Sequence, residues 1–438
     1  MLRAYSPAYA DLREYLDEIP IINTHEHNKG TPRPVKDVLA FLLGPFSYVK
    51  HDLQSAAFGE KKLWNAEHWD GSMSFEERYA IFERRFERAR HTAYTRSMLK
   101  GLEACWGVNK VDRSSLLELQ ERMQGRDQAF YEEQMKRHRI EAQIADIEFS
   151  LFKRVMTGID TDYAESCRFA FPLPSFHHLI LRSHLGIIDG EWTNGEIQTL
   201  DDYVDAFGAL LGQAVRFGVV SLKDQSAYLR TLDYGNPAKA QAEAAFDRLI
   251  CDGRDPLPAN EARALDDWLF QRFMRFAREH GLPVQLHTGH LAGNGGDVRG
   301  ANAAHLTPLL ELNSDVRFDL FHANWPYMGD MLFICKNYPN AYLNFCWAHA
   351  IDPLYCVEMM KRAVMTIPHT KIFAFGGDTS DIEFTIGHLL VLKEIVATAL
   401  SELVDSGWLN GEDARGIALD WFYNNPKAMY GLGAVARS

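Results

Sequence analysis

Four short apolar runs in this 438-residue chain each lead into side chains that can bind a metal ion. In chain order these side chains are His25 with His27, then His287, His322 and Asp378. Successive side chains of a strand alternate between its two faces, so His25 and His27 point the same way. Two imidazoles on one face, joined by a histidine and a carboxylate from other strand ends, supply ligands that suit zinc or a similar ion.

Each histidine in this series also has an ordinary structural interpretation. A His-X-His pair by itself is a weak signal, and separate buried histidines are commonly satisfied by backbone carbonyls. That alternative does not explain why all of these side chains follow the ends of apolar runs. We therefore predict that His25, His27, His287 and Asp378 hold one divalent ion, with zinc as the favoured metal.

Two members of the series have more than one role open to them. His322 is a further ligand, a general acid/base beside the metal or a structural histidine, and an imidazole exchanges protons near neutral pH. Asp378 can ligate the ion and accept a proton from bound water. Alternatively, it can cap the helix expected to follow it.

Three other residues are candidates for contacts with a substrate. Lys223 ends a predicted strand, where its ammonium group can bind an anion. Arg299 follows the glycine-rich loop 293–298, and an arginine can pair with a carboxylate through two hydrogen bonds. Trp325 lies just beyond another predicted strand and can line a pocket, although aromatic residues there are commonly packing. The alternative for both Lys223 and Arg299 is a solvated position in a loop.

Eight apolar segments alternate with helical ones along the chain. Strands are expected over 19–25, 140–147, 169–173, 219–222, 283–287, 318–322, 341–345 and 371–375. Helices are expected over 200–217, 237–250, 260–280, 383–403 and 410–430. Nearly continuous apolar strands joined by helical crossovers predict an α/β fold, a (β/α)8 TIM-like barrel. In such barrels the chemistry lies at the C-terminal strand ends, where the candidate ligands fall.

A long insertion is expected after the first strand. Residues 1–28 supply an N-terminal helix and strand one, residues 29–138 a helical insertion or cap, and residues 139–438 the remaining barrel and the C-terminal helices. Within the insertion, 74–101 and 114–138 look helical, and Ser115 followed by Glu118 fits a capping box. The insertion is placed to cover the barrel mouth.

The motifs that carry this chemistry resemble those of the amidohydrolase superfamily. They are Thr-His-Glu-His at 24–27, Leu-His-Thr-Gly at 286–289, Phe-His-Ala at 321–323 and Gly-Gly-Asp at 376–378. The chain is most similar to the amidohydrolase-2 branch of metal-dependent TIM-barrel hydrolases, whose closing helix resembles residues 421–432. The insertion and residues 287–299 are similar to uronate isomerases. One departure is Asn23, where that branch often has an aspartate.

The resemblance implies roles that the residues alone leave open. In mononuclear relatives the strand-six histidine acts as an acid/base, which favours that role for His322. In binuclear relatives a strand-four lysine is carboxylated and bridges two metals, so a second ion is expected if Lys223 is modified in this way. Relatives hydrolyse, decarboxylate or isomerise their substrates, so the resemblance implies the fold and the metal more closely than the reaction.

The composition of the chain limits the kinds of partner and compartment that we expect. The net charge is -13 without a basic patch, which argues against nucleic acid. The six cysteines form no Cys-X-X-Cys pair, which favours free thiols in a reducing cytoplasm. We expect no membrane-spanning stretch of about 18 apolar residues and no export signal. A small-molecule substrate is the expected partner, and a homo-oligomer is one of the allowed assemblies.

These observations predict a metal-dependent hydrolase acting on a small organic, carboxylate-bearing substrate. Asp378 and His322 are the proposed proton carriers, Lys223 is a catalytic or anchoring residue, and Arg299 is a second anchor. One alternative is a lyase or isomerase on the same site, such as a decarboxylase or a uronate isomerase-like enzyme. Another is a metal-binding protein without catalysis. There is no Gly-X-Ser-X-Gly elbow, no P-loop and no dinucleotide fingerprint to suggest other chemistry.

Overall fold

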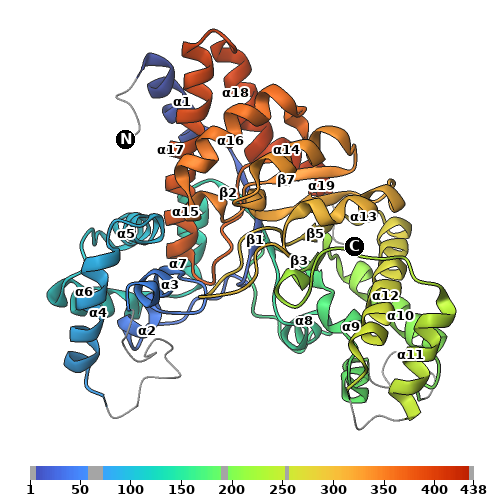
Figure 1. Ribbon diagram of the computed structural model, residues 1–438. Coiled ribbons are helices and arrows are strands. Elements are labelled where there is room, and N and C mark those ends of the chain that lie inside the picture. Colours follow the sequence, from blue (N-terminus) through green and yellow to red (C-terminus); the bar gives the residue numbers. More distant parts are fainter. Residues whose placement is uncertain (1–5, 58–72, 189–195, 252–255, 434–438) are drawn as a thin grey trace.

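The computed structural model describes residues 6–57, 73–188, 196–251 and 256–433 and contains an eight-stranded parallel sheet at its centre (Figure 1). Each strand pairs with the next along the chain, as in a barrel. The strands are β1 Ile21–Glu26, β2 Ile140–Ala145, β3 Cys167–Pro172, β4 Ser221–Asp224, β5 Val284–Leu286, β6 Phe318–Leu320, β7 Ala341–Asn344 and β8 Ile372–Phe373. All eight lie within two residues of a predicted strand start, so the predicted barrel is confirmed.

The strands are buried on both faces, as expected when helices cover the outside of a barrel and side chains fill its interior. Every residue of β1, β4, β5, β6 and β8 is buried. The register sets Ile22 beside Ala142 and Leu286 beside Leu320. The C-terminal ends of the strands therefore meet at one rim.

The barrel closes where β1 meets the segment that follows β8. The amide of Thr24 donates to the carbonyl of Phe375 over 3.0 Å, and the amide of Asp378 donates to the carbonyl of His25 over 3.0 Å. The amide of His27 donates to the carbonyl of Thr379 over 2.8 Å. We call these three hydrogen bonds the closing seam. They place the first and last candidate ligands side by side although more than three hundred residues separate them.

Helices surround the sheet. Those that cover the barrel are α1 Pro7–Glu18, α8 Phe149–Met156, α9 Pro174–His177, α10 Leu200–Phe217, α11 Lys239–Cys251, α12 Ala259–Glu279, α13 Thr307–Leu312, α14 Met328–Asn337, α15 Ala348–Ile351, α16 Pro353–Thr366, α17 Ile382–Asp405, α18 Gly411–Leu419 and α19 Asn425–Met429. Short 3-10 turns lie at η2 Met123–Gly125, η3 Arg182–Ile187, η4 Ser226–Tyr228, η5 Ala303–Leu306, η6 Phe321–Asn324 and η7 His369–Lys371, and a π turn, η8, at Asp420–Asn424. The predicted helix over 410–430 is thus α18, η8 and α19 in succession.

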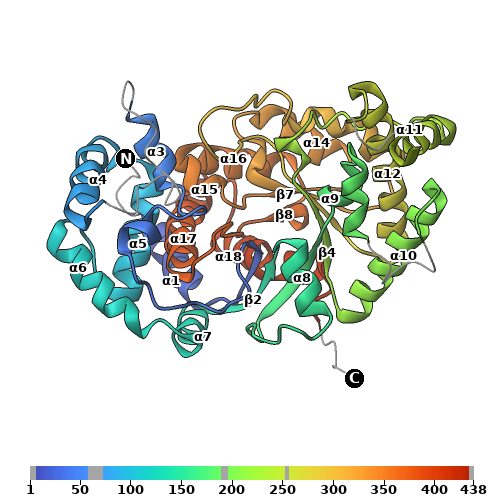
Figure 2. The same ribbon diagram turned by 90° about the horizontal axis from the view of Figure 1, so that it is seen from below.

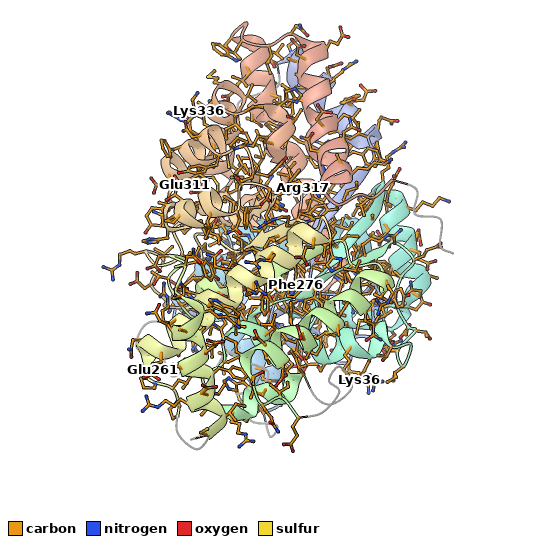
Figure 3. All side chains as sticks on the ribbon, turned by 90° about the vertical axis from the view of Figure 1, so that its right-hand side faces the viewer. Lys36, Glu261, Phe276, Glu311, Arg317 and Lys336 are labelled. Carbon is orange, nitrogen blue, oxygen red and sulfur yellow. The ribbon has the colours of Figure 1, made fainter. Side chains whose placement is uncertain are left out.

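Figure 3 looks onto the side of the barrel covered by α12. Phe276 of α12 packs against Phe207 of α10 with ring centroids 5.8 Å apart. Charged residues of this view such as Glu311 and Lys336 are exposed. The apolar stripe of α12 thus faces inward, as its helical spacing indicates.

The described part of the insertion is helical and forms a lobe beside the barrel (Figure 1). Its helices are α2 Val38–Leu42, α3 Val49–Ser55, α4 Phe75–Ala89, α5 Ala93–Trp106, α6 Arg113–Arg122 and α7 Gln128–Arg137. Residues 58–72 of the predicted insertion lie outside the described residues. The lobe has its own apolar core, which Phe321, Trp347 and Phe384 of the barrel side complete.

Two details of the predicted insertion are wrong. The stretch 74–101 is two helices, because the hydroxyl of Thr92 accepts a hydrogen bond from the amide of Thr95 and starts α5 there. The capping box of α6 uses Asp112 as its cap, and Ser115 is its third helical residue rather than the cap. Asp112 takes the N-cap position because its carboxylate accepts a 2.9 Å hydrogen bond from the amide of Ser115.

Helix α17 corrects the expectation that no helix is long and apolar enough to cross a membrane. Among the described residues one helix, Ile382–Asp405, passes that test by length and composition. Its most apolar window is 89% buried inside the protein, which is typical of a core helix. Viewed from below (Figure 2), α17 lies between the rest of the barrel and helix α5 of the insertion.

Glycines allow α5 and α17 to cross closely. A Cβ atom on Gly101 would lie 1.9 Å from the carbonyl oxygen of Glu383, and one on Gly387 would lie 2.0 Å from the carbonyl oxygen of Ser97. Both distances are impossible for real atoms. The insertion therefore docks on the barrel through a backbone-to-backbone contact that only glycine permits.

Candidate metal centre

Three of the predicted ligands meet at the closing seam. Nε2 of His27 lies 2.9 Å from Oδ1 of Asp378, and Nε2 of His25 lies 3.4 Å from the same oxygen. The ligand atoms of the three residues all lie within 4.8 Å of one another. His25 is fully buried, and neither of its ring nitrogens has a hydrogen-bond partner. A buried imidazole without partners is costly, so this arrangement favours a bound cation.

Backbone carbonyls fix the ring protons of the other histidines. Nδ1 of His27 contacts the carbonyl oxygen of Asp146 at 3.1 Å, and Nδ1 of His322 contacts that of Cys346 at 2.9 Å. Nε2 of His287 contacts the carbonyl oxygen of His290 at 2.6 Å. A carbonyl only accepts hydrogen bonds, so each of these nitrogens carries the proton. The opposite nitrogen of each ring is then free to bind a metal, as is usual for metal-binding histidines.

His287 reaches the centre through His322. Its Nδ1 lies 3.0 Å from Nε2 of His322, and that nitrogen lies 3.8 Å from Oδ2 of Asp378. If both rings are neutral, these two facing nitrogens are both acceptors. Their close approach then requires a proton or a metal ion. Burial lowers the pKa of His322 to about 3 and that of His287 well below its usual value, which disfavours the extra proton.

The charge balance of the centre also accommodates a cation. Burial and the nearby Lys223 lower the pKa of His25 to about 4, so this ring is neutral. Burial opposes ionisation of Asp378, but the nearby rings of His25 and His27 outweigh it and hold the carboxyl pKa well below its usual value. Burial likewise disfavours charge on His27, but Asp378 raises its pKa. Neutral His25 and ionised Asp378 are the forms that bind zinc, and His27 would give up any proton on Nε2 when an ion binds.

A network of polar side chains holds Asp378 in place. Asp378 has a left-handed backbone with φ of 57°, which aspartate tolerates better than most residues. Its carbonyl accepts a 2.5 Å hydrogen bond from the hydroxyl of Tyr48 in the insertion. The buried carboxyl of Glu26 accepts from Asn23, Thr379 and Thr385, and burial raises its pKa to about 7. Asn23 also accepts from the amide of Gly377 over 3.0 Å, so it supports the seam as an amide where relatives have a carboxylate.

Lys223 lies inside the barrel mouth. Its side chain is 3% exposed, and its Nζ lies 4.0 Å from Oδ2 of Asp146 and 5.0 Å from the ring centroid of Phe321. The surface interpretation of Lys223 is therefore wrong. Both remaining interpretations, a carboxylated bridge and an ammonium that binds an anion, place it at this site.

Aromatic side chains line the centre, and two of them, Phe46 and Tyr228, have no role in the sequence-based prediction. Phe46 stacks on His27 with centroids 4.0 Å apart, and Tyr228 lies 4.7 Å from His287. Trp347 lies 5.2 Å from His322 and is fully buried. Phe46 and Tyr228 come from an insertion loop and a 3-10 turn, where no periodic pattern marks them.

The two other predicted substrate contacts lie in different places. Trp325 packs edge-on against His290, whose carbonyl is bonded to His287, with centroids 5.3 Å apart. Arg299 is 84% exposed and pairs with Asp297 at 2.7 Å. The contacts described for Arg299 join it to Asp297 and His305 rather than to the candidate ligands. Its role as an anchor stays a prediction that this placement does not favour.

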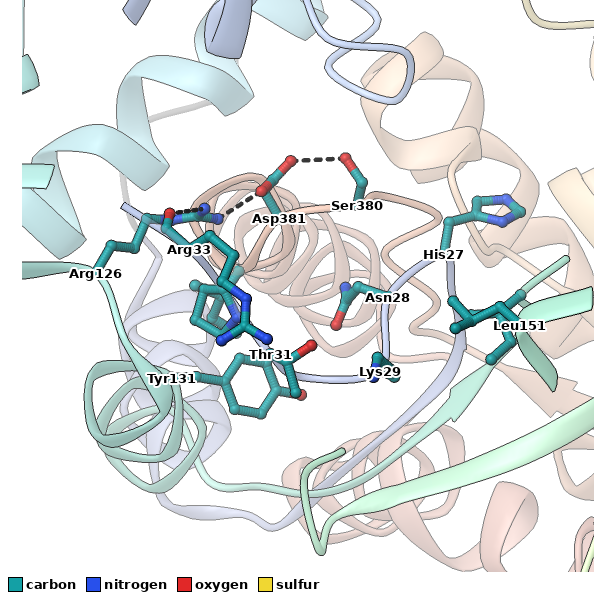
Figure 4. Close-up of a pocket in the computed structure, with 13 residues that line it drawn as sticks. His27, Asn28, Lys29, Thr31, Arg33, Arg126, Tyr131, Leu151, Ser380 and Asp381 are labelled. Atoms are coloured by element: carbon teal, nitrogen blue, oxygen red, sulfur yellow. Dashed lines mark hydrogen bonds and ion pairs between the residues drawn. The ribbon is translucent and has the colours of Figure 1, made fainter. Parts of the chain in front are cut away.

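A pocket of about 330 Å³ opens beside His27 (Figure 4). The loop that follows β1 forms one wall, with Asn28, Lys29 and Arg33. Arg126 of the insertion and Ser380 and Asp381 of the segment after Asp378 also line it. The size suits a small organic molecule, and the position links it to the metal centre.

Known proteins resemble this chain in sequence and in fold. Residues 236–432 match the family model described as Amidohydrolase. Protein fluG of Emericella nidulans is 25% identical over 247 residues, which are 54% of this chain and 28% of that protein. A uronate isomerase of Phenylobacterium zucineum is 25% identical over 269 residues, which are 57% of this chain and 54% of that protein. The chain thus matches less than two thirds of either relative.

The solved uronate isomerase of Thermotoga maritima shares the fold. It superposes with a TM-score of 0.79 at 14% identity and covers 97% of this chain and 98% of its own. At this identity the likeness concerns the fold alone. The family match over residues 236–432 confirms the resemblance to the amidohydrolases that the motifs at 286–289, 321–323 and 376–378 indicate.

Proposed function

We propose that this amidohydrolase-like barrel is a metal-dependent hydrolase of a small, carboxylate-bearing organic substrate. The observation that carries the proposal is the convergence of the His25 and His27 imidazoles on the Asp378 carboxylate, with both ring nitrogens of His25 unpartnered. His25, His27 and Asp378 would hold one divalent ion, for which zinc is the favoured metal, and His287 is the further candidate ligand. The orphaned ring nitrogens of His25 fit such an ion better than any hydrogen bond among the described residues.

The chemistry follows from what these residues hold. A divalent ion bound there supplies Lewis-acid activation of a carbonyl and lowers the pKa of a bound water to about 7. Asp378 is ionised and can take up a proton on Oδ2. His322 can relay that proton because its Nε2 lies 3.8 Å from this oxygen and is unprotonated. Lys223 is positioned either to anchor an anion or, once carboxylated, to bind a second ion.

The first test measures metal content and turnover together. Purified protein should contain about one zinc, and the variants Asp378→Asn and His27→Gln should lose most of it, since both residues belong to the three-ligand group. His287→Gln should lose less, because its Nδ1 lies against His322. Turnover of a panel of esters, lactones and amides should fall at least a hundredfold in Asp378→Asn.

The matched control is Asp297→Asn, which removes an exposed carboxylate from a surface loop and should keep metal and activity. Full activity of Asp378→Asn would overturn its proposed role. Full metal content in both Asp378→Asn and His27→Gln would overturn the metal centre itself.

A uronate isomerase-like activity is the second candidate. The similarity to the Phenylobacterium uronate isomerase supports it. Hydrolysis takes the oxygen of water into the product, whereas an aldose–ketose conversion of D-glucuronate needs no water. Reaction in ¹⁸O-labelled water, with products followed by mass spectrometry and NMR, separates the two. Release of carbon dioxide would identify a decarboxylase, and bound metal without turnover over the whole panel would identify a metal-binding protein.

We further propose that the protein acts on a free small molecule in the cytoplasm. The acidic composition and the enclosed centre support this setting. Cell fractionation checks the compartment, and light scattering of the purified protein checks whether it forms a homo-oligomer.

A further inference from the structure

We propose that the pocket beside His27 binds the carboxylate of the substrate, with Arg33 as its anchor and the amide of Asn28 as a second donor. This inference rests on the proposed function and deepens it. His27 lines the pocket and its Nε2 lies 2.9 Å from Asp378, so an acid group held there lies next to a candidate metal ligand. The sequence suggested Arg299 for this role.

The loop that carries Asn28 and Arg33 is held in place along its length. The carbonyl and the side-chain oxygen of Asn28 each accept from Nε2 of Gln143 over 3.0 Å. The carbonyl of Lys29 accepts from the amide of Ala164 over 2.9 Å. The carbonyl of Arg33 accepts from Arg126 over 3.0 Å. Such a loop is preorganised, so binding a ligand costs little ordering entropy.

One buried polar group of the pocket lacks a partner among the described residues. Nδ2 of Asn28 is buried and makes no hydrogen bond, although the oxygen of the same amide accepts several. Figure 4 shows this amide on the side of the loop that faces Arg33 and Thr31. A ligand that offers acceptor oxygens would satisfy this donor.

The charges of the pocket favour an anionic group on Arg33 in particular. Arg126 is committed to Asp381 at 2.5 Å and to buried Glu383 at 2.9 Å, and Lys29 is committed to Asp160 at 2.8 Å. Among the described residues Arg33 pairs with Asp162 alone, and the two side chains are 74% and 52% exposed. An exposed pair of this kind contributes little, so a ligand can replace Asp162. The guanidinium fork matches a planar carboxylate through two parallel hydrogen bonds.

The test compares two probes and two arginines by isothermal titration calorimetry of the metal-loaded protein. The probes are D-glucuronate and D-glucose, which differ in the carboxylate. D-glucuronate should bind at least tenfold more tightly than D-glucose. Arg33→Gln should weaken D-glucuronate about ten- to a hundredfold, as expected for a lost charge-assisted contact, and leave D-glucose and metal content unchanged.

Arg299→Gln is the matched control, since Arg299 is likewise exposed and paired with an exposed aspartate. It should leave D-glucuronate binding unchanged, whereas Asn28→Asp should weaken it through like-charge repulsion. Equal binding by Arg33→Gln and wild type, a loss in Arg299→Gln instead, equal affinity for both probes, or no D-glucuronate binding by the wild type would each overturn the inference. Because the readout is binding and metal content is measured separately, failure of the proposed catalysis is distinguishable from failure of this anchor.

Discussion

At the scale of single residues, a second buried cluster lies behind the metal centre. His177 contacts Asp266 through Nδ1 at 2.5 Å and Asp224 through Nε2 at 2.7 Å. His178 contacts the other oxygen of Asp266 at 2.8 Å, and Arg230 lies 2.9 Å from that oxygen. Asp224 directly follows Lys223, so the cluster holds the end of β4 on which Lys223 sits. Its positive groups are already matched to its carboxylates, which makes it a positioning network.

This cluster predicts how stability depends on pH. Burial opposes a charge on His177, but Asp266 and Asp224 outweigh it and raise the pKa to about 9, compared with the ordinary 6.5. A pKa raised by folding contributes stability that is complete below about pH 6.5 and is lost as pH rises through about 9. The free energy of unfolding of the metal-free wild type should fall by about 1–3 kcal/mol across this interval. Thermal melting at a series of pH values from about 6 to about 9.5 measures this loss.

The comparison is with His177→Gln, which should be less stable at every pH and should show a flatter pH profile. Tyr234, which donates to Asp224, has a pKa raised well above 10 by burial and does not titrate in this interval. An equal slope in wild type and His177→Gln would contradict the assignment of the charge to His177.

The convergence of some side chains could be predicted from the sequence, and there are physical reasons why other contacts could not be predicted. His25, His27 and Asp378 were predicted because strand ends of a barrel meet at one rim. The cluster around His177 was not, because Asp266 lies on α12, where the apolar stripe of its neighbours hides it, and 89 residues separate it from His177. Arg33 was not noticed because its loop carries no motif. Arg299 was chosen because it follows glycines, yet its partner is the aspartate two residues before it.

At the scale of secondary-structure elements, the contact between α5 and α17 fixes the insertion on the barrel. The sequence predicted both helical stretches and most strand positions, because apolar spacing reports burial. It did not predict this crossing, since a glycine inside a helix usually signals only weak propensity. The insertion brings Tyr48 and Arg126 to the site, so its docking has functional consequences.

Gly101→Ala tests this docking. The added methyl group would meet the carbonyl oxygen of Glu383 at 1.9 Å, so the helices must separate, and we expect a loss of about 2–4 kcal/mol in the free energy of unfolding. Gly416→Ala in α18 is the matched control, because nothing lies within 4 Å of its added Cβ. It should be neutral or stabilise by about 0.5–1 kcal/mol. Similar effects of both substitutions in urea unfolding would show that the crossing is looser than described.

At the scale of the whole molecule, the barrel is closed by the seam at which the candidate metal ligands converge. β8 is only two residues long and forms a ladder with β7, whereas β1 is joined to residues 375–379 by the three seam hydrogen bonds. An ion held by His25, His27 and Asp378 would bridge this seam. We therefore expect metal binding to stabilise the closure as well as to supply chemistry.

Metal removal is the corresponding test. Protein saturated with zinc at a hundred times its dissociation constant should gain about 2.7 kcal/mol over chelator-treated protein, measured by thermal melting. Removal of the metal should accelerate hydrogen exchange at residues 24–27 and 375–379 more than in β3 and β4. Asp378→Asn should show neither response, and a metal-induced stabilisation of that variant equal to wild type would place the ion elsewhere.

The seam also sets an order of events during synthesis. The ribosome makes β1 about 350 residues before its partner segment at 375–379. Until then His25 and His27 have no carboxylate beside them, and the rim of β1 has no strand to cover it. A nascent chain arrested before residue 378 would therefore bind zinc poorly and depend on chaperones to shield its first strand.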